Sequence, residues 1–224
     1  MPSILADYRT HVLNTLGDPT GNRYTTTQLD EAIRAALMEY SAAAPTLQNL
    51  AFLVVTTGRD HALTGTTNLN QIVAVQYPVD AADSNNNRVQ VYYLSYYAGA
   101  PVLHLQFNMP QAGETINITY TASHTITNLD SALSTTIPTV DDALLTLGAS
   151  AHAAIARSTQ ITEQMTQRAS NSPQLAAWGQ ARLAEFRSAL DSLAKTRSDI
   201  FVPQRAWQLD HWDRQPNYKD LPFI

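Results

Sequence analysis

The stretch "TTTQLDEAIRAALMEYSAAAP", residues 25–45, is typical of an amphipathic helix that ends at a proline. Thr26 or Thr27 is expected to cap its start. The acidic pair Asp30 and Glu31 then lies in the first turn, where negative charge suits the helix dipole. Apolar residues recur at intervals of three and four and form one stripe that needs a partner surface: Leu29, Ile33, Leu37 and Tyr40.

Helical spacing recurs on both sides of this stretch. Residues 3–16 precede it, and two further segments, 139–169 and 173–197, follow much later in the chain. Residues 50–125 are different, because β-branched and aromatic residues alternate there between Gly and Asn turns. Five or six strands are expected in that region, and the candidates are 52–57, 61–64, 71–79, 88–97, 102–107 and 115–122.

The order of these segments predicts an α+β fold. The two N-terminal helices alone would form a weak core, so they are expected to pack on the two C-terminal helices as a bundle of about four helices. A small antiparallel β-module is inserted between the second and third helices. The predicted parts are N-terminal helices at 1–48, the β-module at 49–137, C-terminal helices at 138–198 and an extended tail at 199–224.

Composition narrows the possible functions. The chain has 224 residues and a formal charge of -5 with only 14 Lys+Arg, and no basic cluster occurs, so tight binding of DNA or RNA is not expected. Cysteine is absent, which excludes disulfides and thiolate sites and fits a reducing compartment. The longest apolar runs are far shorter than the roughly 20 residues of a membrane helix, so we expect no membrane association.

Motifs for enzyme chemistry are missing from the sequence. We find no nucleophile elbow, no phosphate-binding loop, no dinucleotide fingerprint and no H-E-x-x-H motif. The acidic pairs Asp30-Glu31 and Asp141-Asp142 lie at expected helix starts, where capping explains them. The cluster Asp210-His211-Asp213 is interpreted as solvated charge. The sequence therefore predicts a protein that is not an enzyme and has no cofactor and no metal.

Two aromatic regions are candidates for partner contact. In "YYLSYYAG", residues 92–99, four tyrosines fall within six residues and must place rings on both faces of a strand. Their candidate role is a subunit or tail interface, with plain sheet packing as the alternative: Tyr92, Tyr93, Tyr96 and Tyr97. The segment 201–224 is proline-rich and without period, and its aromatic residues are candidate anchors for a partner's pockets, unless it folds back on the bundle: Phe201, Trp207, Trp212, Tyr218 and Phe223.

The order of parts resembles the head-to-tail connector, or portal adaptor, proteins of tailed bacteriophages. The resemblance is carried by "YRTHVLNTLGDPTGNRYTTTQLDEAIRAALMEYSAAAP", the β-insertion, the "DDALLTLGASAHAAIA" helix, the helix after it and the extended tail. It spans nearly the full chain, but its motifs are diffuse and include no invariant chemical signature.

This resemblance implies a structural virion protein at the head-tail interface, assembled in the host cytoplasm. It would form a ring, typically of twelve copies, that attaches beneath the portal, extends the DNA channel and gives the tail or the next connector ring a docking surface. The tail aromatics would anchor in the portal protein, and DNA would pass through without specific binding. The alternative from the residues themselves is a carbohydrate- or receptor-binding module in the β-domain of a virion or surface protein.

Overall fold

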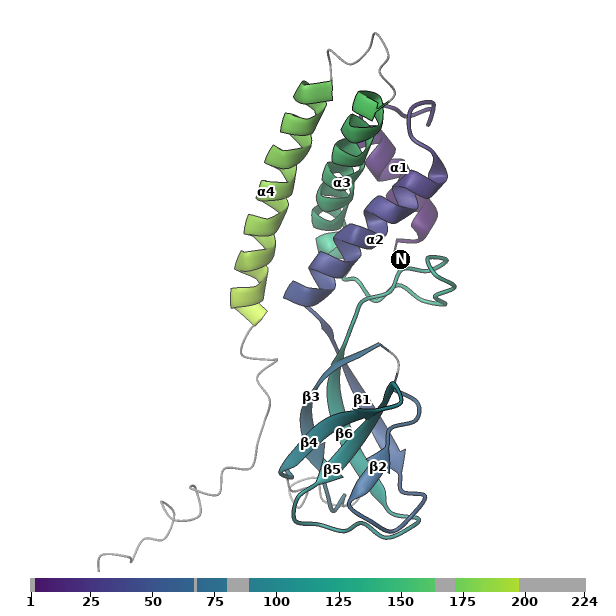
Figure 1. Cartoon of the computed structure of the whole chain (residues 1–224), viewed down its shortest axis with the longest axis vertical. Coiled ribbons are helices and arrows are strands. Elements are labelled where there is room, and N and C mark those ends of the chain that lie inside the picture. Colours follow the sequence, from purple (N-terminus) through teal and green to yellow (C-terminus); the bar gives the residue numbers. More distant parts are fainter. Residues whose placement is uncertain (1–2, 67, 80–88, 164–171, 198–224) are drawn as a thin grey trace, which may run out of the picture. The chain divides into compact units, whose positions relative to one another are not determined.

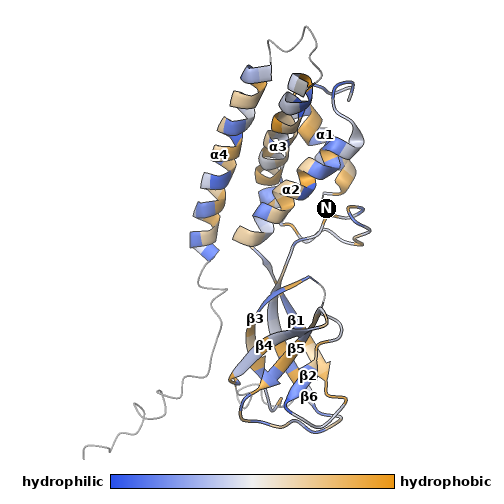
Figure 2. Ribbon diagram, viewed as in Figure 1, coloured by the Kyte–Doolittle hydropathy of each residue, from blue (hydrophilic) through white to orange (hydrophobic). Residues whose placement is uncertain are grey.

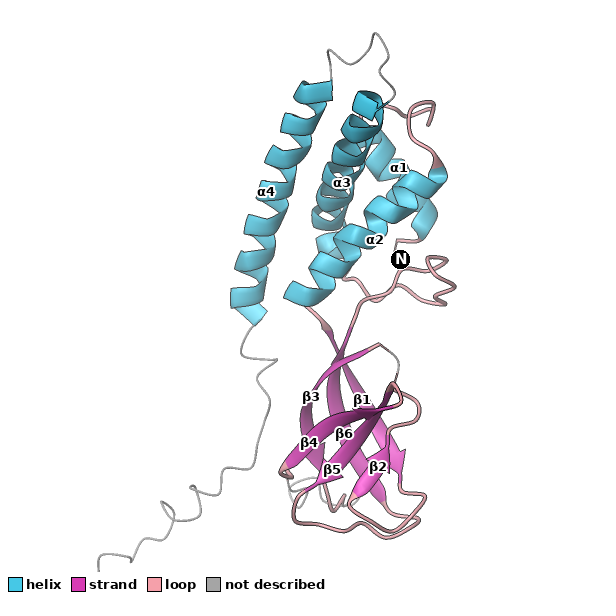
Figure 3. Cartoon of the chain, viewed as in Figure 1, coloured by secondary structure: helices cyan, strands magenta, loops and turns pink. Residues whose placement is uncertain are grey.

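The computed structural model describes residues 3–66, 68–79, 89–163 and 172–197. By their contacts these residues form two compact units, which Figure 1 shows along the chain. The helical unit contains the described parts of 1–46 and 122–200, and the β unit contains the described parts of 47–121. The fold is α+β, as predicted, with the strands inserted between the second and third helices (Figure 3).

Four α-helices build the helical unit within the described residues. They are α1 (Leu5–Thr15), α2 (Thr26–Ala43), α3 (Asp142–Glu163) and α4 (Ser172–Arg197). Helix α3 is central, because α1, α2 and α4 all pack against it. The predicted packing of N-terminal on C-terminal helices is therefore confirmed.

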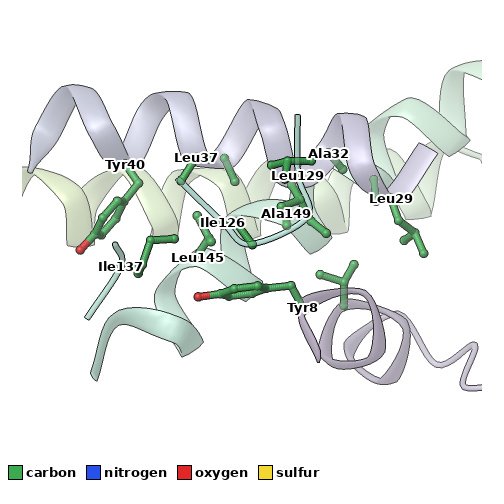
Figure 4. Close-up of a cluster of buried hydrophobic side chains, with 14 of the residues drawn as sticks. Tyr8, Leu29, Ala32, Leu37, Tyr40, Ile126, Leu129, Ile137, Leu145 and Ala149 are labelled. Carbon is green, nitrogen blue, oxygen red and sulfur yellow. The ribbon is translucent and has the colours of Figure 1, made fainter. Parts of the chain in front are cut away.

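The core of the helical unit contains the stripe that the sequence indicated on α2. Leu29, Ile33 and Tyr40 are each no more than 1% exposed, and Tyr8 from α1 is fully buried with them. Figure 4 shows Leu29, Tyr40 and Tyr8 in this core. Three buried side chains come from the segment after the last strand: Ile126, Leu129 and Ile137. Residues 122–137 therefore pack with the helices, whereas the sequence placed them in the β-module because they show no helical period.

Helix α2 begins at Thr26, so its N-cap lies one residue before the earlier of the two expected caps. Thr25, and not Thr26 or Thr27, is the N-cap, because its side-chain oxygen accepts a hydrogen bond from the backbone N–H of Gln28 at 3.3 Å. The Gln28 side chain in turn accepts from the Thr25 N–H at 3.0 Å. This reciprocal capping box satisfies two backbone donors at once, which explains why the first of three threonines is selected.

Helices α3 and α4 approach closely at two glycines. A Cβ atom on Gly148 would lie 2.7 Å from the ring of Phe186, and one on Gly179 would lie 2.8 Å from Ile155 Cγ1. Both distances are shorter than any normal carbon contact, so only glycine fits at either position. The buried ring of Phe186 is thereby held against the backbone of α3.

The β unit consists of two three-stranded antiparallel sheets in its described part. The first sheet has the order β1-β6-β3 and the second the order β2-β5-β4. The strands are β1 (Thr46–Leu53), β2 (Asp60–Ala62), β3 (Leu69–Gln76), β4 (Tyr92–Tyr97), β5 (Ala100–Leu105) and β6 (Thr115–Ala122). All six candidate strands exist, but β1 starts six residues before the expected 52 and leads directly out of α2.

The alternation of residues along each strand determines which side chains are buried inside the β unit. Ile116, Ile118 and Tyr120 of β6 are buried, as their spacing of two predicts. Phe52 of β1 and His61 of β2 lie with ring centroids 6.1 Å apart, so side chains of both sheets meet in one interior.

Candidate functional site

A tight turn between β4 and β5 sets the geometry of the candidate site. Ala98 and Gly99 have φ values of 50° and 82°, the left-handed pair that a type I′ hairpin turn requires. Tyr97 therefore pairs with Ala100, and the same antiparallel register brings Tyr93 opposite His104.

The four tyrosines of β4 divide between the faces of the sheet, as predicted. Tyr92 is half-buried and donates its hydroxyl hydrogen bond to the carbonyl of Ile72 at 2.7 Å. Tyr93, Tyr96 and Tyr97 are 59%, 60% and 80% exposed. One tyrosine thus joins the two sheets, and three present aromatic surface, whose predicted role in subunit or tail contact stays a prediction.

A chain of hydrogen bonds crosses the outward side of the β2-β5-β4 sheet. Ser95 Oγ lies 2.7 Å from His104 Nε2, and His104 Nδ1 lies 2.6 Å from Asp60 Oδ1. The three residues come from β4, β5 and β2, and His104 pairs directly with both Tyr93 and Asp60 in the two ladders. We call these three residues the Ser95–His104–Asp60 chain.

Tyr93 covers the imidazole of this chain. Its ring lies parallel to that of His104, with centroids 4.3 Å apart and planes inclined by 10°. The His104 side chain is consequently only 17% exposed, while that of Asp60 is 70% exposed. One ring face is thus shielded by an aromatic group, whereas the carboxylate end of the chain is open to solvent.

Exposed apolar side chains are concentrated in the β unit. Of the twelve large hydrophobic residues that are exposed in the described chain, eight belong to this unit. They are Leu47, Leu53, Val55, Tyr93, Tyr96, Tyr97, Phe107 and Met109. Figure 2 shows apolar residues along the strands of this unit as well as in the helices. Exposed apolar side chains favour contact with a partner where they form a continuous surface.

The second acidic pair, Asp141 and Asp142, joins helices. Tyr8 of α1 donates its hydroxyl to Asp142, and Tyr40 of α2 donates to Asp141. Arg197 at the end of α4 also donates to Asp141, at 3.0 Å. Burial, together with the bond to Asp141, raises the pKa of Tyr40 to about 12. The expected structural role is thus observed, although the contacts are tertiary and not helix caps.

The first acidic pair, Asp30 and Glu31, lies beyond the first turn of α2 in which the sequence placed it, because the helix already begins at Thr26; both residues make structural contacts. Arg9 holds Asp30 through two hydrogen bonds of 2.7 Å, and Arg34 pairs with Glu31 at 2.7 Å. Arg34 also binds Asp130, whose pKa is lowered by that hydrogen bond. Both carboxylates of the pair therefore take part in ion pairs with arginine.

The helical unit has a groove of about 640 Å³ between α1, α3 and α4. Its titratable lining residues are His11, Asp142 and Arg182. Asp142 already accepts hydrogen bonds from Tyr8 and Ser3, and Arg182 pairs with Glu185 at 2.8 Å. The groove therefore brings together no set of available acids or histidines.

Several predicted residues lie outside the described residues. These are the tail aromatics and the Asp210-His211-Asp213 cluster: Phe201, Trp207, Trp212, Tyr218, Phe223, Asp210, His211 and Asp213. Among the described residues, no group of three or more His, Cys, Asp or Glu side chains is arranged to hold a metal ion. In the same part of the chain no helix combines the length and apolar character of a membrane span.

Sequence reasoning missed the Ser95–His104–Asp60 chain, because no local motif contains it. Ser95 and His104 are nine positions apart, and Asp60 lies 44 positions before His104. The available signal was "YAGAP", which the sequence does mark as a turn. A two-residue turn at Ala98-Gly99 fixes Tyr93 opposite His104 and so places Ser95 diagonally beside it.

Comparison with known proteins gives a limited likeness. No protein-family model and no curated protein matches the chain. Among solved structures, the chain is similar to a chain from the neck of an empty GTA particle computed with C6 symmetry, at 20% identity over 65% of this chain and 74% of that one, with a TM-score of 0.31. The neck of a native GTA particle computed with C12 symmetry gives 21% identity over 65% and 72% of the two chains, with a TM-score of 0.30.

Proposed function

We propose that the chain is a structural virion protein, a head-to-tail connector whose ring beneath the portal extends the DNA channel and gives the tail a docking surface. The observation that carries this proposal is the exposed apolar side chains of the β unit, which include Tyr93, Tyr96 and Tyr97 and five other large hydrophobic residues. A surface of this kind favours contact with neighbouring protein.

The division of the chain into two units supports the same function. The helical unit buries its stripe residues around α3 and suits the body of a ring, because its core is formed within one chain. The β unit supplies the contact surface towards neighbouring subunits, the tail or the next connector ring. A formal charge of -5 suits a DNA conduit, since a basic channel would hold the DNA that must pass.

The tail at 199–224 supplies the second contact in this proposal. Its aromatic residues anchor in pockets of the portal protein, because Trp and Tyr contribute most strongly to such contacts. The ring has twelve copies, is located at the head-tail interface of the virion and assembles in the host cytoplasm. It needs no catalytic group, cofactor or metal.

Truncation of the tail tests the portal contact. Full-length protein and a version that ends after Ser198 are each sized alone and after mixing with the candidate portal protein. Full-length protein is expected to co-elute with the portal, whereas the truncated protein folds normally and elutes alone. Equal binding by both would remove the anchor role, and loss of folding on truncation would mean that the tail folds back on the bundle.

Point variants separate the two contact surfaces. The double variant Trp207→Ala/Trp212→Ala is expected to lose portal binding and keep ring formation, whereas Tyr96→Ala/Tyr97→Ala weakens ring or tail contact and keeps portal binding. The same tyrosine variant tests carbohydrate binding, which the three exposed rings also favour, since aromatic faces can stack on sugars. Glycan binding by full-length protein that is lost in this variant would support the carbohydrate module instead of the connector.

A further inference from the structure

The Ser95–His104–Asp60 chain has the connectivity of an activated nucleophile. A hydroxyl lies within hydrogen-bond distance of one imidazole nitrogen, and a carboxylate lies within hydrogen-bond distance of the other, at 2.7 Å and 2.6 Å. This is the arrangement in which a base takes the proton of a weak nucleophile while a third group orients that base.

The carboxylate decides the direction of the hydrogen bonds. An ionised Asp60 can only accept, so the Nδ1 atom of His104 carries the proton and donates it. The Nε2 atom is then the lone-pair side of the ring and accepts the hydrogen bond of the Ser95 hydroxyl. The tautomer required for general-base action is therefore the one that Asp60 imposes.

Backbone and ring contacts hold the three side chains in place. Asp60 and His104 are direct partners in the β2-β5 ladder, and Ser95 lies one diagonal step from His104 in the β4-β5 ladder. The stacked ring of Tyr93 prevents the imidazole from turning away. Because the supporting residues lie on strands and not on a loop, the geometry is set by the sheet itself.

The site is open to a small reagent. Ser95 is half-buried, and Tyr93 and Tyr97, which flank it on the same side of β4, are both exposed. An acyl or aryl group that approaches the hydroxyl would contact these two rings. The surroundings therefore favour a short ester with an apolar or aromatic portion over a charged compound.

From these observations we propose that Ser95 is a reactive serine that is acylated by short carboxylic esters with good leaving groups. The Ser95 oxygen attacks the ester carbonyl carbon as His104 Nε2 removes the hydroxyl proton. Collapse of the tetrahedral intermediate breaks the bond to the alcohol oxygen, and the proton on His104 leaves with the alcohol. The acyl group remains on Ser95 until water, deprotonated by the same imidazole, releases it as the acid. Asp60 is a positioning residue, because it acts only through His104.

This reactivity goes beyond the proposed connector function and does not depend on it. A ring protein can carry an activated serine on the outward side of its β unit, and the serine would then be a site for covalent modification. Tail truncation removes none of these three residues, so its outcome and the outcome of the labelling below are separate.

The proposal is tested by labelling the folded full-length protein with p-nitrophenyl acetate and, separately, with a fluorophosphonate probe. The expected result is a burst of p-nitrophenolate of one equivalent per chain and a stable adduct that peptide mapping assigns to Ser95. Ser95→Ala abolishes the adduct. His104→Gln lowers the acylation rate by about 100-fold or more, the usual contribution of a general base.

Asp60 needs a readout that a purely structural role would not change. Asp60→Asn is expected to lower the acylation rate at least about tenfold, because asparagine no longer fixes the proton on Nδ1, and Asp60→Glu restores part of that rate.

Ser188→Ala on α4 is the matched control, because Ser188 is exposed and is not part of the Ser95–His104–Asp60 chain. We expect this variant to be labelled to the same extent as the wild-type protein. Urea-unfolded protein controls for intrinsic serine reactivity, and thermal melts show whether each variant folds. The proposal is overturned if the folded wild-type protein labels at Ser95 no faster than the unfolded chain. It is equally overturned if folded His104→Gln labels at the wild-type rate.

Discussion

The helical unit and the β unit use apolar residues in opposite ways. In the helical unit the large side chains converge on α3, and only four large hydrophobic residues of its described part are exposed, compared with eight in the smaller β unit. Burial in the helices provides stability, whereas the open side chains of the strands do not contribute to a core. Both units have a buried interior, but a larger share of the exposed large hydrophobic residues lies on the strands and loops of the β unit.

The largest test of this contrast is Phe186→Ala in α4. The ring is fully buried and rests on Gly148, so its removal leaves a cavity that the α3 backbone cannot fill. We expect the free energy of unfolding to fall by about 3–5 kcal/mol. Tyr97→Ala in the β unit, where the ring is 80% exposed, should change it by less than about 0.5 kcal/mol.

Urea titration of both variants measures these two changes. A large loss of stability in Tyr97→Ala would mean that the exposed tyrosine packs within the chain and is not a free contact surface. A small loss in Phe186→Ala would mean that the helical unit is not closed around α3.

The next effect concerns the polar bonds inside the helical unit. Tyr40→Phe removes the hydroxyl that donates to Asp141 and leaves the carboxylate with Arg197 as its remaining bonded side chain. A buried acceptor that loses a partner costs about 1–3 kcal/mol, so unfolding should become easier by that amount. Tyr96→Phe is the control, because its exposed hydroxyl is solvated in both proteins. Equal melting temperatures for the two variants would contradict the structural role of Asp141.

The helices and the strands also differ in how much their sequence predicts. The α2 stripe from Leu29 to Tyr40 predicts both the helix and its buried side, because a period near 3.6 has one structural solution. The alternation Ile116, Ile118, Tyr120 does the same for β6. In these elements local pattern and burial agree.

Features that depend on distant pairing were not predictable in this way. The contacts of Tyr8 and Tyr40 with Asp142 and Asp141 join residues more than 100 positions apart, and no spacing rule connects them. The Ser95–His104–Asp60 chain depends on strand register, which a one-residue slip would destroy. Capping residues and turns can be chosen locally, but register and helix docking are chosen by the whole fold.

A pH titration sharpens the comparison, because each unit buries one histidine. Burial lowers the pKa of His61 in the β unit and of His124 in the helical unit. As the pH falls, the unfolded chain therefore binds protons at these histidines before the folded chain does. The stability that this difference affects is fully present above pH about 6.5, and it is lost as the pH falls through the lower folded pKa values. Thermal melts from pH 8 to pH 5 should show a falling melting temperature.

The two buried histidines differ in their hydrogen-bond partners. His124 bonds to the carbonyl of Ala44 at 2.8 Å and to Thr136 at 3.0 Å, whereas His61 Nε2 has no hydrogen-bond partner among the described residues. His61→Phe keeps a ring against Phe52 and removes the titrating group, so it should flatten part of the decline below pH 6.5. An unchanged pH dependence in this variant would assign the whole effect to the helical unit.

The smallest expected effect is a gain of stability at the turn that builds the candidate site. Ala98 holds a φ of 50°, which costs an alanine about 1 kcal/mol, and Asn-Gly is the pair that type I′ turns prefer. Ala98→Asn should therefore stabilise the β unit by up to about 1 kcal/mol and leave the reactivity of Ser95 unchanged, because the register that pairs Tyr93 with His104 is preserved. Lower stability, or altered labelling of Ser95 in a folded variant, would mean that this turn does not fix the pairing register of β4 and β5.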